Sequence, residues 1–110
     1  MLIVMLSEEQ MNEIAEKHIS AMVKRTNIPV LIGYEHTIKK EYGNIFFYNS
    51  KKRIETGDDK YAIAGNAPFL VENKTGKVVD FGTARSIEYY LEEYEAGRYI
   101  SITDSRLPPG

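Results

Sequence analysis

Two histidines are the side chains of this chain best suited to acid–base chemistry. His18 falls within apolar residues at helical spacing, and His36 falls in a strand-like segment near Tyr48. An enzyme would need His36 beside Tyr48, or His18 beside an acid, in a pocket that perturbs the titration of the imidazole. Motifs for zinc ligands, a nucleophile elbow or a phosphate-binding loop are missing. We therefore expect no catalytic residue, no metal ligand and no cofactor, and interpret both histidines as packed structural residues.

The densest group of acidic residues lies in a polar segment, where Glu55, Asp58 and Asp59 fall within five positions. A calcium-binding loop would need further oxygen ligands at alternating positions, which this segment lacks. An aspartate here can cap a turn, and a group of carboxylates can contact a basic partner. Tyr48 and Tyr61 are close by in sequence and are candidate anchors, because tyrosine combines a large apolar area with a hydroxyl group. We expect these five residues to contact a partner protein.

The composition indicates a soluble globular protein without disulfides. The chain has 110 residues, no cysteine and a formal net charge of −2. The lack of cysteine excludes thiolate metal sites and thiol nucleophiles and suits a cytoplasmic protein. The slight acidic excess, without a clustered basic face, argues against nucleic acid as the partner. The apolar run at residues 1–6 is too short for a signal sequence or a membrane span, so we expect no membrane association.

A few elements must position these side chains. A capping box at Ser7–Gln10, followed by apolar residues at three-and-four spacing, predicts a helix over residues 7–25. A second apolar stripe predicts a shorter helix over 86–96. The tail 105–110 is rich in proline and is expected to fray. At this length we expect a single domain over 1–110.

Two antiparallel hairpins are predicted between the helices, within residues 30–82. Lys40–Gly43 and Asn73–Gly76 each match a type I turn that a left-handed glycine closes with a bulge. In the second hairpin this turn sets Phe69 opposite Phe81 and Val71 opposite Val79, and it places these four apolar side chains on one face. The hairpins thus contribute the strands of one sheet.

The first hairpin is predicted to pair Ile38 with Phe46 and His36 with Tyr48. Its second strand carries apolar residues on both faces, so we expect it to be covered on both sides. Residues 49–59 are polar and broken by glycine, which predicts a loop with at most a short strand. Together these elements predict an α+β fold: an N-terminal amphipathic helix on a four- to five-stranded antiparallel sheet, with a shorter C-terminal helix.

The middle of the chain carries several short motifs in order. They are Tyr42–Gly43, Phe47–Ser50, Thr56–Asp58, Gly65–Pro68, Thr75–Gly76, Gly82–Thr83 and Tyr90–Tyr94. With these motifs the chain resembles, over about residues 7–95, the YrhB-like family, also described as the immunity protein 35 family of bacterial polymorphic toxin systems. That family usually carries a tryptophan just after the Tyr-Gly pair, whereas this chain has Asn44. If that tryptophan helps to seal the core or a partner surface, the resemblance implies that a neighbour takes over this role here: Ile45, Phe46 or Tyr42.

The resemblance implies a bacterial, cytoplasmic, antitoxin-like protein that neutralises a cognate toxin by stoichiometric binding, and it brings no catalytic residues with it. A second interpretation, also attached to the YrhB branch, is a small chaperone-like holdase that binds exposed apolar segments on an aromatic sheet face. The two differ in specificity, since the first binds one neighbour-encoded partner tightly and the second suppresses aggregation of several unrelated proteins. The sequence leaves the oligomeric state open between monomer and homodimer.

Overall fold

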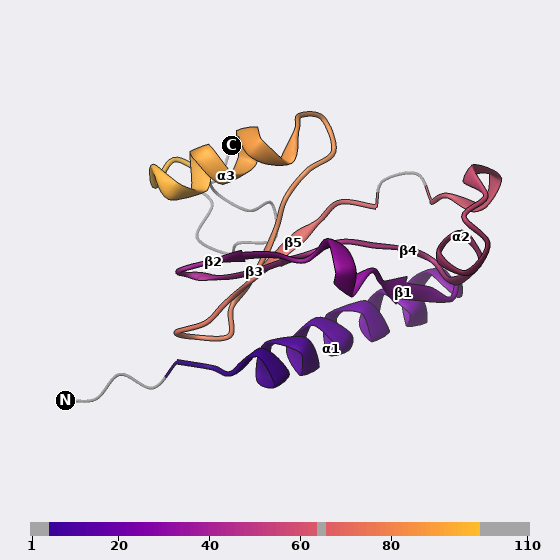
Figure 1. Ribbon diagram of the computed structural model, residues 1–110, viewed down its shortest axis with the longest axis horizontal. Coiled ribbons are helices and arrows are strands. Elements are labelled where there is room, and N and C mark those ends of the chain that lie inside the picture. The colour runs from indigo at the N-terminus through magenta and orange to yellow at the C-terminus, as the bar shows by residue number, and fades with distance from the viewer. Residues whose placement is uncertain (1–4, 64–65, 100–110) are drawn as a thin grey trace.

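The computed structural model describes residues 5–63 and 66–99, so the tail 105–110 lies outside the described residues (Figure 1). The elements in chain order are α1 (Glu8–Thr26), β1 (Val30–Ile32), the 3₁₀ helix η1 (Tyr34–His36), β2 (Ile38–Lys40), β3 (Gly43–Phe46), β4 (Tyr48–Ser50), α2 (Lys51–Thr56), the 3₁₀ helix η2 (Asp59–Tyr61), β5 (Phe69–Glu72), β6 (Val78–Asp80) and α3 (Ile87–Glu95). None of the helices in the described ranges has the length and apolar character needed to cross a membrane.

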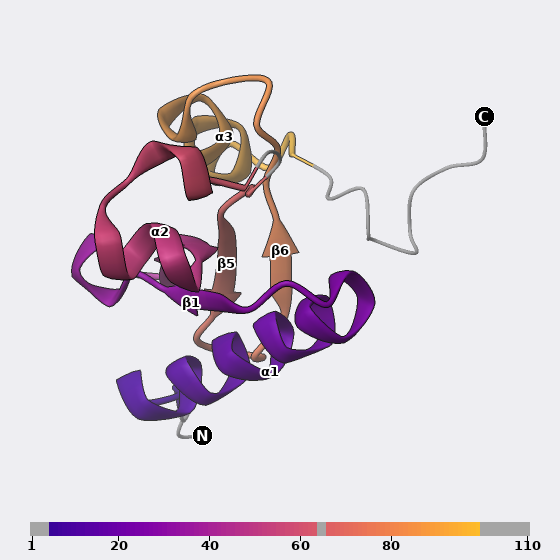
Figure 2. The ribbon, with the colours of Figure 1, turned by 90° about the vertical axis from the view of Figure 1, so that its right-hand side faces the viewer.

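The strands form two antiparallel sheets. A four-stranded sheet has the order β2-β3-β5-β6, and β1 pairs with β4 in a separate two-stranded sheet. α1 covers one face of the four-stranded sheet and α3 covers the other, which gives three layers, with α2 to one side (Figure 2). The predicted α+β class, with a long N-terminal helix, an antiparallel sheet and a shorter C-terminal helix, is confirmed.

The two long helices are delimited by capping residues. Ser7 Oγ accepts a hydrogen bond from Gln10 N at 3.1 Å, and Ser7 N donates to Gln10 Oε1 at 2.8 Å, which completes the predicted capping box. Asn27 ends α1 in the left-handed conformation, with φ 58°. Ser86 caps α3, because its Oγ accepts from Tyr89 N at 3.2 Å. These local bonds fix where each helix begins or ends.

The core consists of two clusters, one on each face of the four-stranded sheet. Under α1 the buried residues are Met11, Ala15, Ile19, Ile32, Phe46, Tyr48, Phe69 and Val71. Under α3 they are Ile45, Leu70, Val79, Phe81, Tyr90 and Leu91. The central strands β3 and β5 contribute to both clusters, so the expectation that the second strand of the first hairpin is covered on both sides is confirmed.

The predicted pairing of the second hairpin is wrong by one residue. Phe69 pairs with Asp80 rather than with Phe81. The loop contains four residues, Asn73–Gly76, and its last N–H donates to Glu72 O at 2.9 Å, whereas the predicted turn has three loop residues. Because side chains alternate along a strand, the shift sends Phe69 to the α1 side and Phe81 to the α3 side.

The first hairpin shows the same shift. Ile38 pairs with Ile45, one residue before the predicted partner, and the loop has only two residues, Glu41 and Tyr42. Asn73, in the neighbouring turn, holds this loop: its N–H donates to Tyr42 O at 2.9 Å and its side-chain amide donates to Glu41 O at 2.8 Å. The tight loop is therefore stabilised by a residue far away in sequence, which a local turn pattern does not reveal.

His36 is also placed differently from the prediction. It lies in η1 with 71% of its side chain exposed, and Tyr48 pairs instead with Ile32 of β1. Gly33 N donates to Phe47 O at 2.9 Å, and the chain then turns into η1 before β2 begins. The second strand predicted for the first hairpin is thus divided between β3, in the four-stranded sheet, and β4, in the two-stranded sheet.

A short helix, α2, occupies most of residues 49–59, where the sequence predicts a loop. Ser50 Oγ accepts from Arg53 N at 3.0 Å at its start. Gly57, with φ 73°, ends it and donates its N–H to Arg53 O at 2.8 Å. Thr56 completes the last turn, since its Oγ1 donates to Lys52 O at 2.7 Å. Capping at both ends therefore outweighs the polar composition of the segment.

Gly76 adopts the predicted left-handed conformation, with φ 75°. We expect Gly76→Val to lower the free energy of unfolding by about 1–2 kcal/mol, because a Cβ is strained there. That Cβ would also lie 3.0 Å from Ile14 Cδ1. The exposed neighbour serves as the control, since Thr75→Ala should change stability by at most about 0.5 kcal/mol. Urea melts give the comparison, and equal midpoints for the two variants would contradict this account.

Candidate functional site

Four of the five residues predicted to contact a partner lie together, around α2 and η2 (Figure 1): Glu55, Asp58, Asp59 and Tyr61. We call residues 51–61 the α2 end. The fifth residue, Tyr48 in β4, is only 7% exposed, and its ring centroid lies 6.1 Å from that of Phe69 in the core. The predicted set therefore divides into a surface group and a residue that lies beneath it.

The carboxylates of the α2 end are accompanied by basic side chains. Asp59 Oδ1 lies 3.1 Å from Arg53 Nε, and Asp58 Oδ2 lies 3.7 Å from Lys60 Nζ. Asp58 also caps η2, because its Oδ1 accepts from Lys60 N at 3.0 Å. Residues 51–60 contain four basic and three acidic side chains. The α2 end is thus a surface of mixed charge rather than an acidic patch.

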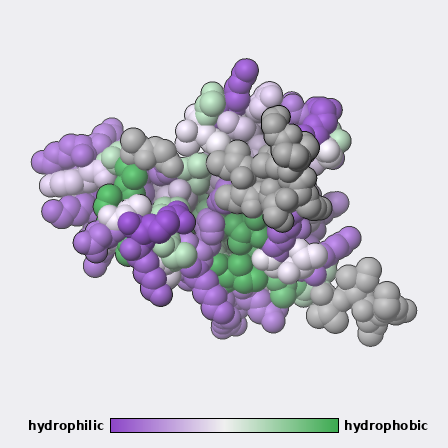
Figure 3. Space-filling view, turned by 180° about the vertical axis from the view of Figure 1, so that it is seen from behind, coloured by the Kyte–Doolittle hydropathy of each residue, from purple (hydrophilic) through white to green (hydrophobic). Residues whose placement is uncertain are grey.

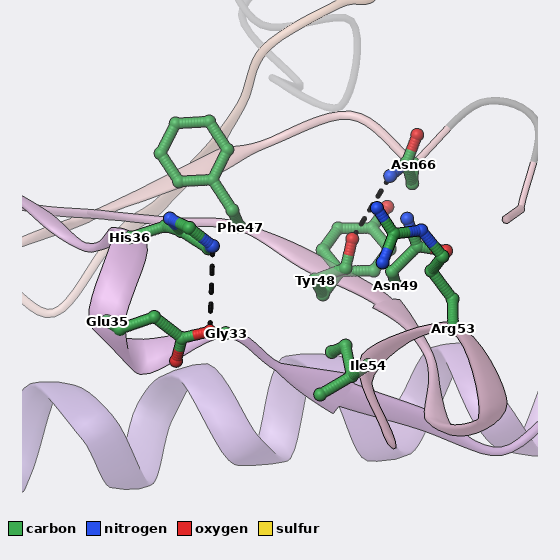
Figure 4. Close-up of a pocket in the computed structure, with 9 residues that line it drawn as sticks. All are labelled: Gly33, Glu35, His36, Phe47, Tyr48, Asn49, Arg53, Ile54 and Asn66. Atoms are coloured by element: carbon green, nitrogen blue, oxygen red, sulfur yellow. Dashed lines mark hydrogen bonds and ion pairs between the residues drawn. The ribbon is translucent and has the colours of Figure 1, made fainter. Parts of the chain in front are cut away.

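A polar hollow of about 230 Å³ lies beside α2 (Figure 4). Glu35 and His36 of η1 line it on one side, with 3.5 Å between Oε1 and Nε2, and Arg53 of α2 lines it on the other. Asn66 also lines the hollow and is bonded to β4, because its Nδ2 donates to Tyr48 O at 3.1 Å. With charged groups on both sides, the hollow suits a polar or charged side chain of a partner.

His36 and Tyr48 line this same hollow, which is one of the two arrangements that an enzyme would need. The pKa of Tyr48 is raised, mainly by burial and further by the Asp80 carboxylate. A phenol that holds its proton so firmly is a poor general base at neutral pH. His36 is exposed and lies beside Glu35. We interpret the two residues as part of a polar lining.

His18 has an acidic partner, in a different part of the molecule. Its Nε2 lies 3.0 Å from Asp80 Oδ1, and its ring centroid lies 4.5 Å from that of Phe69. Both side chains of the pair are 26% exposed. The pair joins α1 to β6, so we interpret His18 as a residue that fastens the helix to the sheet. Among residues 5–63 and 66–99, no three histidine or acidic side chains are grouped closely enough to hold a metal ion.

A second hollow, of about 450 Å³, is mainly apolar. Ile28 and Pro29, which follow α1, line one part, while Glu55 and Tyr61 line another. Ile28 is 43% exposed, which is high for a large apolar side chain. The Lys52 ammonium lies 5.2 Å from the centroid of the Tyr61 ring. An apolar hollow with a charged rim suits an apolar anchor residue of a partner.

α2 is the ridge between the two hollows. Arg53 and Ile54 line the polar hollow, whereas Lys52 and Glu55 line the apolar one. At 3.6 residues per turn these two pairs project from opposite sides of the helix. A short, capped helix thus presents two different surfaces within a few residues.

Ile28 and Arg53 are surface residues that the sequence does not single out as candidates. Ile28 follows the predicted first helix, which ends at residue 25, and Arg53 falls in the loop predicted over residues 49–59. The sequence does carry a signal for the short helix that holds Arg53. Ser50 and Gly57 are at the spacing of an N-cap and a left-handed C-cap around about one and a half turns of helix. No comparable local signal marks Ile28, because its exposure depends on the direction that the chain takes between the end of α1 and the start of β1.

Together, the fold and the two hollows define a small α+β protein whose surface is suited to binding. The chain belongs to the Immunity protein 35 family, whose model matches residues 10–97. It is 35% identical over 69 residues to the uncharacterized protein YrhB of Escherichia coli (strain K12), a match that covers 63% of this chain and 71% of that protein. No solved structure matches the chain. The resemblance predicted from the short motifs is therefore confirmed.

Asn44, the residue that follows the Tyr42-Gly43 pair, is buried beneath α1. It is 2% exposed, and its Nδ2 donates to Glu8 Oε2 at 3.0 Å. Its neighbours Ile45 and Phe46 are both 0% exposed, one in each core cluster, while Tyr42 packs against the α3 side. The core is thus filled by these neighbours, and Asn44 ties the start of α1 to β3.

Proposed function

We propose that this protein is an immunity protein of a bacterial polymorphic toxin system, which neutralises a cognate toxin in the cytoplasm by binding it one to one and without catalysis. Membership of the Immunity protein 35 family, over residues 10–97, is the observation that carries the proposal. A binding role asks for complementary shape and charge rather than for reactive groups. It is consistent with the role of His18 in fastening α1 to the sheet.

We propose the α2 end as the surface that contacts the toxin. Glu55 and Tyr61 border the apolar hollow, and Asp58 and Asp59 are exposed beside it. Tyr48 is buried beneath this surface and would contribute to toxin binding as part of the lining of the polar hollow. Interfaces usually gain most of their affinity from a few anchors that enter such hollows, with charged residues around them. Mixed charge at the rim would add specificity for one partner.

The chaperone-like alternative needs an exposed aromatic sheet face. Phe46 and Phe69 are 0% exposed under α1, and Phe81 is 3% exposed under α3. Hydrophobic residues on the face shown in Figure 3 form small groups, one near the centre and one toward the left, among hydrophilic ones. An aromatic face would therefore open only if a helix detached. Equal suppression of the aggregation of several unrelated client proteins would favour this alternative over ours.

The double variant Asp58→Ala, Asp59→Ala tests the proposed surface. We expect it to bind the toxin encoded by the neighbouring gene about tenfold more weakly and to lose neutralisation in cells that produce that toxin. The matched control, Glu9→Ala with Glu13→Ala, removes two exposed carboxylates from α1 and should neutralise normally. Circular dichroism establishes that both variants are folded.

The outcomes separate the surface from the function. Full neutralisation by the Asp58→Ala, Asp59→Ala variant would show that the α2 end is not the contact. Equal loss in both double variants would indicate dependence on net charge rather than on this surface. Failure of the unchanged protein to bind or neutralise the toxin would refute the proposed function itself.

A further inference from the structure

The apolar hollow beside α2 has walls from three segments that are bonded to one another. Lys51 N donates to Pro29 O at 2.9 Å, which ties α2 to the chain that follows α1. Ser50, which is 8% exposed, donates from its hydroxyl group to Tyr61 O and so ties α2 to η2. The hollow is therefore formed before a partner arrives, and little conformational freedom is lost when it is filled.

The lining of this hollow suits a large apolar side chain. Its volume is about 450 Å³, and its apolar lining residues are Ile28, Pro29 and Tyr61. Ile28 and Pro29 are both exposed, so this part of the wall faces water in the free protein. A partner that covers it removes apolar area from water, which favours binding. Such hollows receive the anchor residues of tight interfaces.

Ammonium groups gather around one end of the hollow. Lys51 and Lys52 are the first two residues of α2, and both line the hollow. Glu55, about one turn further along the helix, is the single carboxylate among the described residues of the lining. The Lys52 and Lys60 ammonium groups lie 5.2 Å and 5.1 Å from the centroid of the Tyr61 ring. The start of α2 and the aromatic wall thus present three cations against one carboxylate.

Two of these cations have no ion-pair partner in the molecule. Within residues 5–63 and 66–99, no carboxylate is paired with Lys51 or Lys52, whereas the other two basic residues of the α2 end are paired with its two aspartates. Lysines at the start of a helix also oppose its dipole, so the stability of α2 does not account for them. They are therefore available to carboxylates of a partner.

We propose that this hollow receives a large apolar side chain of the toxin that has aspartate or glutamate next to it in sequence, and that Lys51 and Lys52 pair with those carboxylates. The apolar side chain packs against Ile28 and the Tyr61 ring. The inference rests on the proposed function and deepens it, because it specifies the chemistry of the toxin segment that the α2 end recognises. The same cations reject an apolar residue that has lysine or arginine next to it.

Three acetylated and amidated pentapeptides probe the hollow without the toxin. The first has phenylalanine between two pairs of aspartates, the second has phenylalanine between two pairs of lysines, and the third has alanine between two pairs of aspartates. Each is titrated into the protein while the methyl signals of Ile28 and the ring signals of Tyr61 are followed by NMR. We expect saturable shifts with the first peptide, which added salt weakens, and affinities at least about tenfold lower for the other two.

Four outcomes of these titrations would overturn the proposal. Equal affinity for the first and second peptides would mean that the lysines play no part in recognition. Equal affinity for the first and third would mean that no apolar anchor enters the hollow. Unchanged Ile28 and Tyr61 signals with all three peptides would mean that the hollow binds none of them. If dilution of the protein alone shifts the same signals, a second copy of this chain fills the hollow instead of the toxin.

Variants of the two lysines extend the test to the toxin itself. Lys51→Gln combined with Lys52→Gln should lower the affinity for the first peptide about threefold, since both pairs are exposed to solvent. The affinity for the toxin encoded by the neighbouring gene should fall more, about tenfold, because a larger interface excludes water from the same pairs. The matched control, Lys17→Gln with Lys74→Gln, removes two exposed ammonium groups outside the hollow and should change neither affinity. Circular dichroism establishes that both variants are folded.

The toxin measurements separate this inference from the proposed function. If the unchanged protein neutralises the toxin and the Lys51→Gln, Lys52→Gln variant binds it equally well, the inference fails and the proposed function stands. If the unchanged protein does not bind the toxin, the proposed function fails and the assignment of the hollow to the toxin fails with it. The peptide titrations still decide in that case which chemistry the hollow recognises.

Discussion

Phe69→Ala is expected to lower the free energy of unfolding by about 3–5 kcal/mol, which is most of the stability of a typical small domain. Phe69 is 0% exposed. Its ring centroid lies 4.5 Å from that of His18 in α1, 5.6 Å from Phe46 in β3 and 6.1 Å from Tyr48 in β4. Truncation would leave a cavity where a helix and three strands meet. Urea unfolding followed by circular dichroism measures the loss.

An exposed aromatic residue is the matched control. Tyr89→Ala removes a ring of similar size that is 41% exposed, so it should cost no more than about 1 kcal/mol. A double-mutant cycle then tests which face Phe69 occupies. We expect Phe69→Ala and His18→Ala to couple by about 1 kcal/mol, and Phe69→Ala and Leu91→Ala to be additive, because Leu91 belongs to α3 and packs on the opposite face of the sheet. Coupling with Leu91 alone would place Phe69 on the same face of the sheet as Phe81, as the sequence predicts.

The positions of the long helices could be predicted from sequence because their ends depend on neighbouring residues. Ser7 and Gln10 bond each other across three positions, and Ser86 bonds an amide three residues later. The same kind of signal is present at Ser50 and Gly57 around α2, but the polar composition of the segment between them also fits a loop. Local chemistry therefore predicts the ends of a helix better than the existence of a short one.

The register of the second hairpin could not be predicted, for two physical reasons. A three-residue and a four-residue loop both place Gly76 in the left-handed conformation, and they differ only in which strand residues lie opposite one another. The strand itself offers no alternation to decide between them, since Phe69, Leu70 and Val71 are all buried. A strand covered on both faces is apolar at every position, so a one-residue shift leaves the pattern unchanged.

The candidate surface was predictable only in outline. Glu55, Asp58 and Asp59 do lie together, because they are close in sequence. Their pairing with basic side chains depends on how α2 and η2 fold against each other, as the contact between Asp59 and Arg53 shows. Tyr48 lies below the surface because β4 pairs with β1, and nothing in either short strand specifies that partner. The two hollows are products of tertiary packing in the same way.

Gly43→Ala is expected to lower the free energy of unfolding by about 3 kcal/mol or more, the largest effect of an alanine substitution at any glycine that the structure describes. Gly43 begins β3 and pairs with Glu72 of β5. An added Cβ would lie 2.1 Å from Val71 O and 3.0 Å from Leu70 Cδ1, so the two central strands would have to separate. From the sequence, this glycine is predicted to close a turn in the left-handed conformation. Its φ is 155°, however, and its close contact is with the neighbouring strand.

Gly57→Ala is the matched control for the backbone conformation. Gly57 also has a positive φ, 73°, but an added Cβ would meet no atom within 4 Å. Its substitution should therefore cost only about 1 kcal/mol, the strain of a side chain in that region. Urea melts of the two variants give the comparison. A difference of about 2 kcal/mol between them would measure the contact with β5, whereas equal costs would mean that backbone conformation alone requires glycine at position 43.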